Sequence, residues 1–519
     1  MAWIPEPPSA ERLRVLAARA MEAARSAGAD FADIRIGVQR GLAVPPVPSG
    51  ISISLTVGYG VRACVNGCWS FQHGDVLTPD AVVDAARSAT AGARVYAGVN
   101  AGLDRAYGRQ SPAPWAPVPA ESGTWNGPMV IDPFEVSIDD HLRLLGTRND
   151  ELEHLDLFSH FVVRGGSWQD DLRVFSSTDG AMLTQHVVHG GSGFGGGARD
   201  PRHGPSVAVD VRGLDADLTG GFERAMPSDM LQRGLAGIDD AVRFAELPWR
   251  AFTDVGRFPV VFDGASFAKM FGNSMSMALD GDRASGVERD ASGGSFLTPL
   301  PDILDASEPP CSPRLTVRSD RALPWPCAAR WDDDGVATEP FTLIQDGRIV
   351  DYHTTRETAP MLADWYAKRG QALRSHGGSV APTPASVPIG SGGHVQIAPS
   401  ASRAGRDDLL RELTHGFYIR DVRVGVTPGL TNIVCPGDPD FLILEVRNGV
   451  PVARTVVTTR MATRLVFGKN LVALGDAETL RTRTASATKG IPWQWVEYPV
   501  TAPAALCKDI DVVGLLGAL

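Results

Sequence analysis

The stretch that most restricts the fold is residues 58–72, GYGVRACVNGCWSFQ, in which Asn66 and Gly67 separate two apolar runs. The Asn-Gly dipeptide favours the tight turn whose twist matches that of the flanking strands. Apolar and polar residues alternate before this stretch, at 33–38 and at 51–57, as they do in half-buried strands. The sequence therefore predicts an antiparallel sheet built around a hairpin.

Two helices are predicted on either side of these strands. Residues 9–28 repeat apolar side chains at helical spacing, with Ser9 as a cap and Gly28 as the stop. Thr78 followed by Pro79 opens the second helix, because proline is tolerated in the first turn. Together these elements predict an N-terminal α+β domain over residues 1–105.

The rest of the chain divides by composition. Residues 106–128 are rich in Pro, Gly and Ser and predict a spacer. Residues 129–250 predict a middle α+β domain, with a helix at 137–153 and strands that lead into a glycine-rich loop near GSGFGGG at 191–197. Residues 251–519 predict a β-rich C-terminal domain.

One segment of that C-terminal domain allows two interpretations. Residues 372–400 contain SHGGSVAPTPASVPIGSGG, which is either an ordered crossing segment or a mobile loop. Near the end of the chain, FLILEVRNGVPVARTV contains a second Asn-Gly turn between apolar runs.

Composition limits the function. The formal net charge is -11, which disfavours a nucleic-acid partner because phosphate backbones are also anionic. The sequence has no apolar run of about 18 residues, so no membrane-spanning segment is expected. The 6 cysteines are scattered over 519 residues, unlike a disulfide scaffold, and no signal peptide opens the chain. We therefore expect a cytoplasmic protein.

Five stretches, in order, resemble the TldD/PmbA (TldD/TldE) metalloprotease family. They are ADFADIRI followed by GYGVRACVNGCWSFQHGD, VFSSTDGAMLTQHV, FPVVFDGASFAKMFGNSMSMALDGDRASG, DDDGVATEPFTLIQDGRIVDY, and GDPDFLILEVRNGVPVARTV. The resemblance covers residues from about 10 to 515 and implies an α+β fold. It also implies a dimer that acts on unfolded peptides within an enclosed lumen. One subunit type of the family, TldD, holds zinc, and the other, TldE or PmbA, does not.

The resemblance also places the family's catalytic residues on this chain. Catalytic members carry an H-E-x-x-x-H helix before an LEGD segment, which here is LDGD at 279–282. Counting back puts the histidine ligands at Gly272 and Met277 and the glutamate base at Asn273. The third ligand, a cysteine, falls near Ile491. None of these side chains can serve as the zinc ligand or the general base that its position requires, so we predict no catalytic residue, no metal site and no cofactor.

We also expect apolar side chains to close the vacated site, with Met277 packed near Trp493 and Trp495. Two other groups of residues are candidate sites. His186 and His189 are three apart on a strand, which puts their rings on opposite faces. The run of aspartates at 332–334 is interpreted as a solvated strand entry.

Residues elsewhere favour packing over chemistry. Cys64 and Cys68 flank the first Asn-Gly turn, where core packing is the expected role. His394 and His415 are isolated in the sequence.

Two functions follow from these observations. The first is a TldE/PmbA-like non-catalytic subunit that helps enclose the lumen and binds unfolded peptide beside a zinc-bearing TldD-like partner. The alternative is a stand-alone homodimer that binds a peptide or small molecule, or that performs metal-free chemistry in a specialised pathway. The sequence does not assign substrate-binding residues or decide whether the chain is an enzyme.

Overall fold

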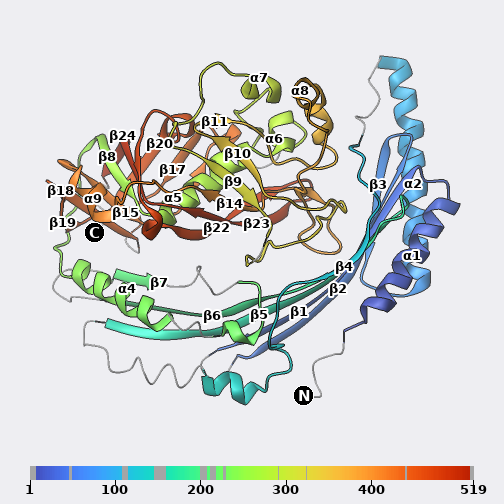
Figure 1. Ribbon diagram of the computed structural model, residues 1–519, viewed down its shortest axis with the longest axis horizontal. Helices are drawn as coiled ribbons and strands as arrows, with labels where there is room; N and C mark the ends of the chain where they lie inside the picture. Colours follow the sequence, from blue (N-terminus) through green and yellow to red (C-terminus); the bar gives the residue numbers. More distant parts are fainter. Residues whose placement is uncertain are drawn as a thin grey trace.

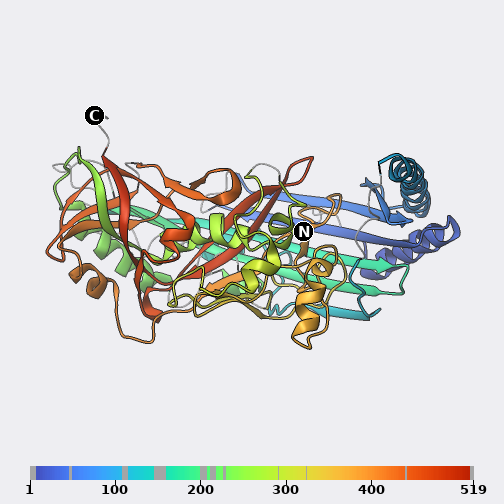
Figure 2. The same ribbon diagram turned by 90° about the horizontal axis from the view of Figure 1, so that it is seen from above.

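A long curved sheet and a compact C-terminal body make up the molecule, with the body lying along one face of the sheet (Figure 1). Figure 2 shows the strands of the sheet running lengthwise beneath that body. The computed structural model describes residues 7–45, 50–107, 115–144, 159–198, 207–210, 218–225, 230–289, 292–322, 324–438 and 441–514. Part of the predicted helix at 137–153 lies outside these residues.

The N-terminal hairpin and its two helices are confirmed. The elements are α1 (Ala10–Ser26), β1 (Phe31–Val44), β2 (Ser52–Val65), β3 (Cys68–Gly74) and α2 (Pro79–Tyr107). The Ser9 side chain accepts a hydrogen bond from the Arg12 amide and so caps α1. Asn66 and Gly67 both have positive φ, which the expected turn between β2 and β3 requires.

Strands from the middle of the chain extend the same sheet. They are β4 (Ser122–Asn126), β5 (Ser159–Ser177), β6 (Met182–Ala198) and β7 (Val207–Asp210). The order is β3-β2-β1-β5-β6-β4, with β7 also paired to β6, and every pairing except β4–β6 is antiparallel. The predicted N-terminal and middle domains thus share one sheet, and β4 lies within the range 106–128. The division into these domains stays a proposal.

The glycine-rich stretch at 191–197 is strand and not loop, so that prediction is wrong. It forms the end of β6 and pairs with both β5 and β7. Glycine weakens a strand but keeps both backbone hydrogen-bonding groups, so it can still pair with neighbouring strands. Composition alone does not reveal those partner strands. At Gly190 the absence of a side chain is required, since φ is +151° and a Cβ would lie 2.2 Å from the Ser167 carbonyl oxygen.

The C-terminal body contains two large sheets. The first has the order β16-β17-β20-β24-β8-β15-β18-β19, and β21 pairs with β24. Its strands are β8 (Val255–Phe262), β15 (His415–Arg420), β16 (Gly425–Val426), β17 (Asn432–Cys435), β18 (Leu442–Arg447), β19 (Val450–Arg454), β20 (Val457–Ala462), β21 (Leu471–Leu474) and β24 (Ala505–Gly514). The predicted turn at Asn448 and Gly449 joins β18 to β19.

The second large sheet has the order β11-β10-β9-β14-β23-β22. Its strands are β9 (Val317–Asp320), β10 (Phe341–Gln345), β11 (Arg348–Ile349), β14 (His394–Ile397), β22 (Arg481–Lys489) and β23 (Gln494–Ala502). A small pair, β12 (Ser379–Val380) and β13 (Ile389–Gly390), lies within the segment 372–400. Of the two interpretations of that segment, the ordered crossing is therefore the correct one.

Helices fill the spaces around these sheets. They are α4 (Met230–Ala245), α5 (Gly264–Phe271), α6 (Gly281–Ser285), α7 (Leu300–Leu304), α8 (Ala363–Lys368), α9 (Arg406–Arg411) and α10 (Thr463–Val466), with a π-helical segment η2 (Gly272–Ser276) after α5. The short 3-10 segments are η1 (Phe222–Arg224), η3 (Ala359–Leu362), η4 (Pro428–Leu430) and η5 (Ala477–Thr479). The mixture confirms the predicted α+β fold class. Among the described residues, no helix has the length and hydrophobicity needed to cross a bilayer.

Alternation along β1 divides the curved sheet into two faces. Ile34, Ile36 and Val38 pack against α1 and α2 in one hydrophobic core. Arg35 and Gln39 point to the opposite face, toward the C-terminal body. At this end of the sheet, α1 and α2 therefore cover one face and the C-terminal body lies on the other.

A buried charge cluster fastens the body to this sheet. Arg62 of β2 forms ion pairs with Asp33 of β1 at 2.6 Å and with Asp334 of the body at 2.8 Å. Asp332 is also buried and accepts backbone hydrogen bonds from Val336 and Ser379. The prediction that the aspartates at 332–334 are solvated is wrong, because arginines of the sheet and backbone amides of the C-terminal body compensate their burial.

We expect Arg62→Met to lower the free energy of unfolding by about 3–5 kcal/mol, since it leaves two buried carboxylates without their cation. The matched control is Arg87→Met on α2, whose side chain is 65% exposed and which should change stability by less than about 0.5 kcal/mol. Denaturant titration of both variants measures this difference. Equal stability of the two variants would contradict a central role for Arg62.

Candidate functional site

A cavity of about 470 Å³ lies between the curved sheet and the C-terminal body. We call it the cleft. Side chains of the sheet form one wall, and segments of the body with β22 and β23 form the other. Its lining includes residues of the sheet and of the body. They are Gln169, Asp171, Arg173, Gln185 and His189 from the sheet, and Arg321, Trp325, Cys327, Thr482, Thr484, Trp495 and Tyr498 from the body.

The sheet wall is polar because of the same alternation that buries apolar side chains behind it. Gln169, Asp171 and Arg173 are every second residue of β5, and Gln185 and His189 lie in register on β6. His189 lies 3.9 Å from Asp171. This wall therefore offers donors and acceptors of several kinds along the cleft.

His186 and His189 of β6 are predicted to place their rings on opposite faces of the strand, and their contacts agree with this prediction. His189 lines the cleft, while His186 binds Asp170 at 2.6 Å, and Asp170 also pairs with Arg40. The hydrogen bond with Asp170 raises the pKa of His186. Because they have different partners, the two rings do not form a common site.

The body wall combines aromatic rings with small polar groups. Trp325 packs against His394, whose ring centroid is 4.4 Å away, and His394 bonds the Thr501 hydroxyl at 2.7 Å. Burial lowers the pKa of His394 to about 3, so this ring is neutral. Burial also raises the pKa of Cys327 to about 11, which keeps it a thiol and not a nucleophilic thiolate at neutral pH.

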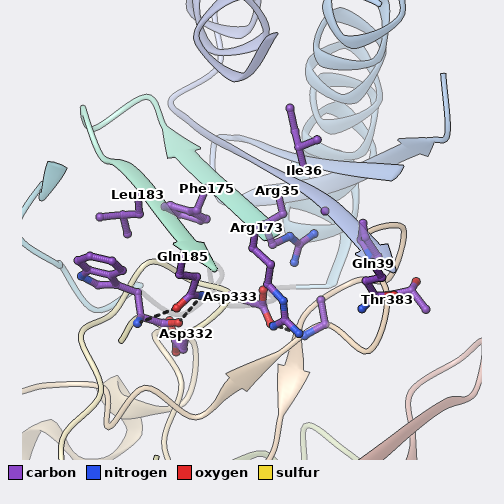
Figure 3. A pocket seen from close by; sticks show the side chains of 14 residues that line it. Arg35, Ile36, Gln39, Arg173, Phe175, Leu183, Gln185, Asp332, Asp333 and Thr383 are labelled. Atoms are coloured by element: carbon purple, nitrogen blue, oxygen red, sulfur yellow. Dashed lines mark hydrogen bonds and ion pairs between the residues drawn. The ribbon is translucent and has the colours of Figure 1, made fainter. Parts of the chain in front are cut away.

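A smaller pocket of about 30 Å³ adjoins the cleft and shares Gln39, Arg173 and Gln185 with it. We call it the arginine pocket. Figure 3 shows the Arg35 and Arg173 side chains reaching from the sheet toward Asp333 of the body. Arg173 lies 3.9 Å from Asp333 and 3.3 Å from Asp171.

Asp332 also lines the arginine pocket, and its charge is reduced. Burial and the neighbouring charge of Asp334 raise the pKa of Asp332 to about 8, against hydrogen bonds from backbone amides that favour the carboxylate. Arg35 and Arg173 supply the positive charge of this pocket, and Asp333, 3.9 Å from Arg173, opposes it.

The helix that the resemblance assigns to metal binding is packed closed. Gly272 begins the π-helical segment, where a Cβ would lie 2.4 Å from the Ala485 Cβ and 2.9 Å from a Val500 methyl carbon. The Asn273 amide donates to the Ser486 carbonyl of β22 at 3.1 Å, and Met277 is buried in the main core of the body. Tyr498 donates to the Gly272 carbonyl at 2.7 Å and so partners a backbone group of the distorted helix.

Ile491 lies in the turn between β22 and β23, apart from these residues, and is 88% exposed. Trp493 and Trp495 are also exposed, at 70% and 58%. The expectation that these tryptophans close the site with Met277 is therefore wrong. The core residues Ala485 and Val500 fill the space beside Gly272 instead, because the two strands pack directly on the helix.

These residues do not fit zinc. Among the residues that the structure describes, no three His, Cys, Asp or Glu side chains gather as metal ligands. Asp280 and Asp282 of the LDGD segment are already held by the buried Lys489 ammonium, at 2.7 Å and 3.0 Å. The chemistry of the donor set, and the absence of room at Gly272, both argue against a metal at this helix.

Sequence reasoning missed the arginine pocket and most of the cleft. The signal was present in the alternation of β1, where Asp33, Arg35 and Gln39 share one face. The segment that covers this face, near Pro384, comes from a distant part of the chain, and its contact with Gly37 is not evident from sequence.

Comparison with known protein families identifies the class of protein to which this chain belongs. The model of a metallopeptidase domain, described as the PmbA/TldA metallopeptidase C-terminal domain, matches residues 255–514. Three solved structures have the same fold over nearly the whole chain. TldE from Thermococcus kodakarensis has a TM-score of 0.66 at 14% identity and covers 96% of this chain and 100% of its own.

The other two are described as candidate modulators of DNA gyrase. That from Thermotoga maritima has a TM-score of 0.64 at 13% identity, covering 96% of this chain and 100% of its own. That from Bacteroides thetaiotaomicron has a TM-score of 0.64 at 14% identity, covering 98% and 100%. Curated proteins give no significant match. The family match, which spans half of the chain, shows that it belongs to the TldD/PmbA family.

Because Gly272 touches Ala485 and Val500, we expect Gly272→Ala to destabilise the chain by about 1–3 kcal/mol through overpacking. The control is Gly98→Ala in the exposed part of α2, where no atom lies within 4 Å of an added Cβ. That change should stabilise by about 0.5–1 kcal/mol, as alanine does in helices. Unfolding midpoints of both variants test the prediction, and a stabilising effect at Gly272 would contradict it.

Proposed function

We propose that this chain is a TldE/PmbA-like, non-catalytic subunit that holds unfolded peptide for a zinc-bearing TldD-like partner. The observation that carries the proposal is a pairing of features in one chain. The helix assigned to catalysis is closed on β22 and β23 and carries Gly272, Asn273 and Met277, while a cleft of about 470 Å³ stays open beside the same two strands.

The walls of the cleft suit an extended peptide of varied sequence. The Gln169 amide carries both a donor and an acceptor, and the Thr484 hydroxyl can do the same, whereas the Gln185 amide is engaged by the backbone of Arg330 and Trp331. Such groups match the repeating amide and carbonyl groups of a peptide backbone. Trp325 and the other apolar parts of the wall supply contact area for side chains without strict selection.

The exposed turn between β22 and β23 supports association with another protein. Ile491 and Trp493 are large apolar side chains that are 88% and 70% exposed. Exposed apolar groups of this size are common where a partner binds. A TldD-like subunit is the partner that we propose, and a second copy of this chain is the alternative.

A cytoplasmic location belongs to the same proposal. The 6 cysteines are all free, and 5 of them are buried, as expected for a protein of a reducing compartment.

We expect the purified chain alone to leave a disordered casein substrate intact, and the mixture with a TldD-like partner to cleave it in a chelator-sensitive way. Hydrolysis needs an activated water, and Asn273 cannot act as its base. Asn273→Ala should therefore leave cleavage by the mixture nearly unchanged. Chelator-resistant hydrolysis by the chain alone, abolished by that substitution, would overturn the proposal and favour an enzyme of its own.

Blocking the cleft should have the opposite effect. Thr484→Trp places an indole in the cleft and should reduce cleavage by the mixture at least about tenfold, an effect of about 1.4 kcal/mol. Val95→Trp on the exposed surface of α2 adds the same side chain elsewhere and should have no effect. Equal rates for these two variants would show that peptide does not use the cleft.

Elemental analysis provides a separate test. We expect well below one zinc per chain after mild chelator treatment, since a structural or catalytic site needs three or four protein ligands. One equivalent of zinc retained by the pure chain would reveal a metal site elsewhere. That result would contradict the metal-free subunit on which the proposal rests.

A further inference from the structure

Arg35 is a buried cation whose hydrogen-bonding capacity is largely unused. Its residue surface is 5% exposed, and it sits on the face of β1 that looks toward the body. Its Nη2 donates to the Ser386 carbonyl at 3.2 Å. Among the described residues, neither Nε nor Nη1 has an acceptor. Unpaired buried donors are unfavourable, and more so on a charged group.

The acidic groups nearest to Arg35 are occupied by other partners. Asp33 and Asp334 are bound by Arg62. Asp333 accepts a hydrogen bond from the Ala381 amide at 2.8 Å and lies 3.9 Å from Arg173. These carboxylates lessen the local positive potential, but none of them hydrogen-bonds Arg35.

The charge of Arg35 persists near neutral pH. Burial and the nearby Arg62 lower the pKa of Arg35 to about 10, which is still well above physiological pH. The carboxylate oxygens of Asp332, on the opposite wall, accept hydrogen bonds from the backbone amides of Asp334, Val336 and Ser379. Arg35 thus faces a pocket in which the neighbouring acids are already engaged.

The pocket has the right size and position for a small anionic group. Its volume of about 30 Å³ would hold roughly two water molecules, close to the two oxygens of a carboxylate. Figure 3 shows Arg35 beside Arg173 and Gln39, pointing away from Ile36. Gln39, Arg173 and Gln185 line the cleft as well, so a chain lying in the cleft can extend a group into this pocket.

We propose that the arginine pocket binds a carboxylate of the peptide held in the cleft, with Arg35 as the donor that anchors it. The inference rests on the proposed peptide-holding function and names a preference that this function does not require. The carboxylate is that of a peptide C-terminus or of an aspartate or glutamate side chain. Either would accept from the free Arg35 nitrogens in an enclosed site, where charge-assisted hydrogen bonds are strong.

The experiment is fluorescence anisotropy with the purified full chain, alone and with its zinc-bearing partner inactivated by chelator. The probes are rhodamine-labelled decapeptides of alanine, serine and leucine that differ in one feature. The first ends in a free carboxylate, the second in an amide, and the third is the amide with one internal glutamate. We expect the first or third to bind at least about tenfold more tightly than the second.

Substitutions assign the effect to Arg35. Arg35→Met should remove the difference between acidic and neutral peptides and leave the affinity of the neutral amide unchanged, while Arg35→Lys should keep part of the difference. Arg330→Met is the matched control, because Arg330 is an exposed arginine of the body that lines neither cavity. It should behave as the unaltered chain.

A stability measurement separates binding from a purely structural role. Arg35→Met gives up one hydrogen bond, to the Ser386 carbonyl, and leaves no carboxylate without its hydrogen-bonding partner, so its melting temperature should fall far less than that of Arg62→Met. A large fall would mean that Arg35 holds the fold, and the inference would be overturned.

The binding outcomes separate the inference from the proposed function. Equal affinity for all three peptides, or a preference for acid that survives Arg35→Met, would overturn the carboxylate pocket and leave the peptide-holding function standing. Binding of none of the peptides in either setting would overturn both. A preference confined to the first peptide assigns the C-terminal carboxylate, and one confined to the third assigns an acidic side chain.

Discussion

The pairing of Arg62 with Asp33 and Asp334 is the interaction on which the relation of the two bodies depends. Its guanidinium also lies over the Trp115 ring, with the cation 5.0 Å from the ring centroid. Three buried charges are tolerated because each has its counterpart at hydrogen-bond distance. The contact fixes the spacing between the sheet and the body, and this spacing determines the cleft and the arginine pocket.

Alternation along single strands links the core to the site. On β1, the residues that pack against the helices and those that face the body are neighbours in sequence, so one strand serves both purposes. The same holds on β5 and β6, whose polar residues line the cleft. A change of register by one residue would exchange the two faces, so the hydrophobic core also secures the position of every polar side chain on the cleft wall.

Local signals in the sequence predicted local structure well. The turn at Asn66 and Gly67 and the capped helix α1 depend on neighbours within a few residues, and they are confirmed. The expected burial of Cys64 and Cys68 is also confirmed, although Cys68 packs against Ala93 and Ala97 of α2. The failures involve long-range contacts. Asp332 and Asp334 are polar by type but buried, and their partners include the Ser379 amide and Arg62, which are far away in sequence. The glycines of β6 are strand because β5 and β7 flank them. The arginine pocket needed three distant segments and could not be predicted from any one of them.

The close fit of Gly272 against Ala485 and Val500 bears on the history of a chain like this one. A histidine at position 272 would need volume that the two strands already fill, so that single substitution would not be accepted without rearranging them. Several substitutions would have to occur together before any regained ligand offered an advantage. The packing around Gly272 is therefore a barrier to a zinc ligand at this position that is separate from the missing side chains.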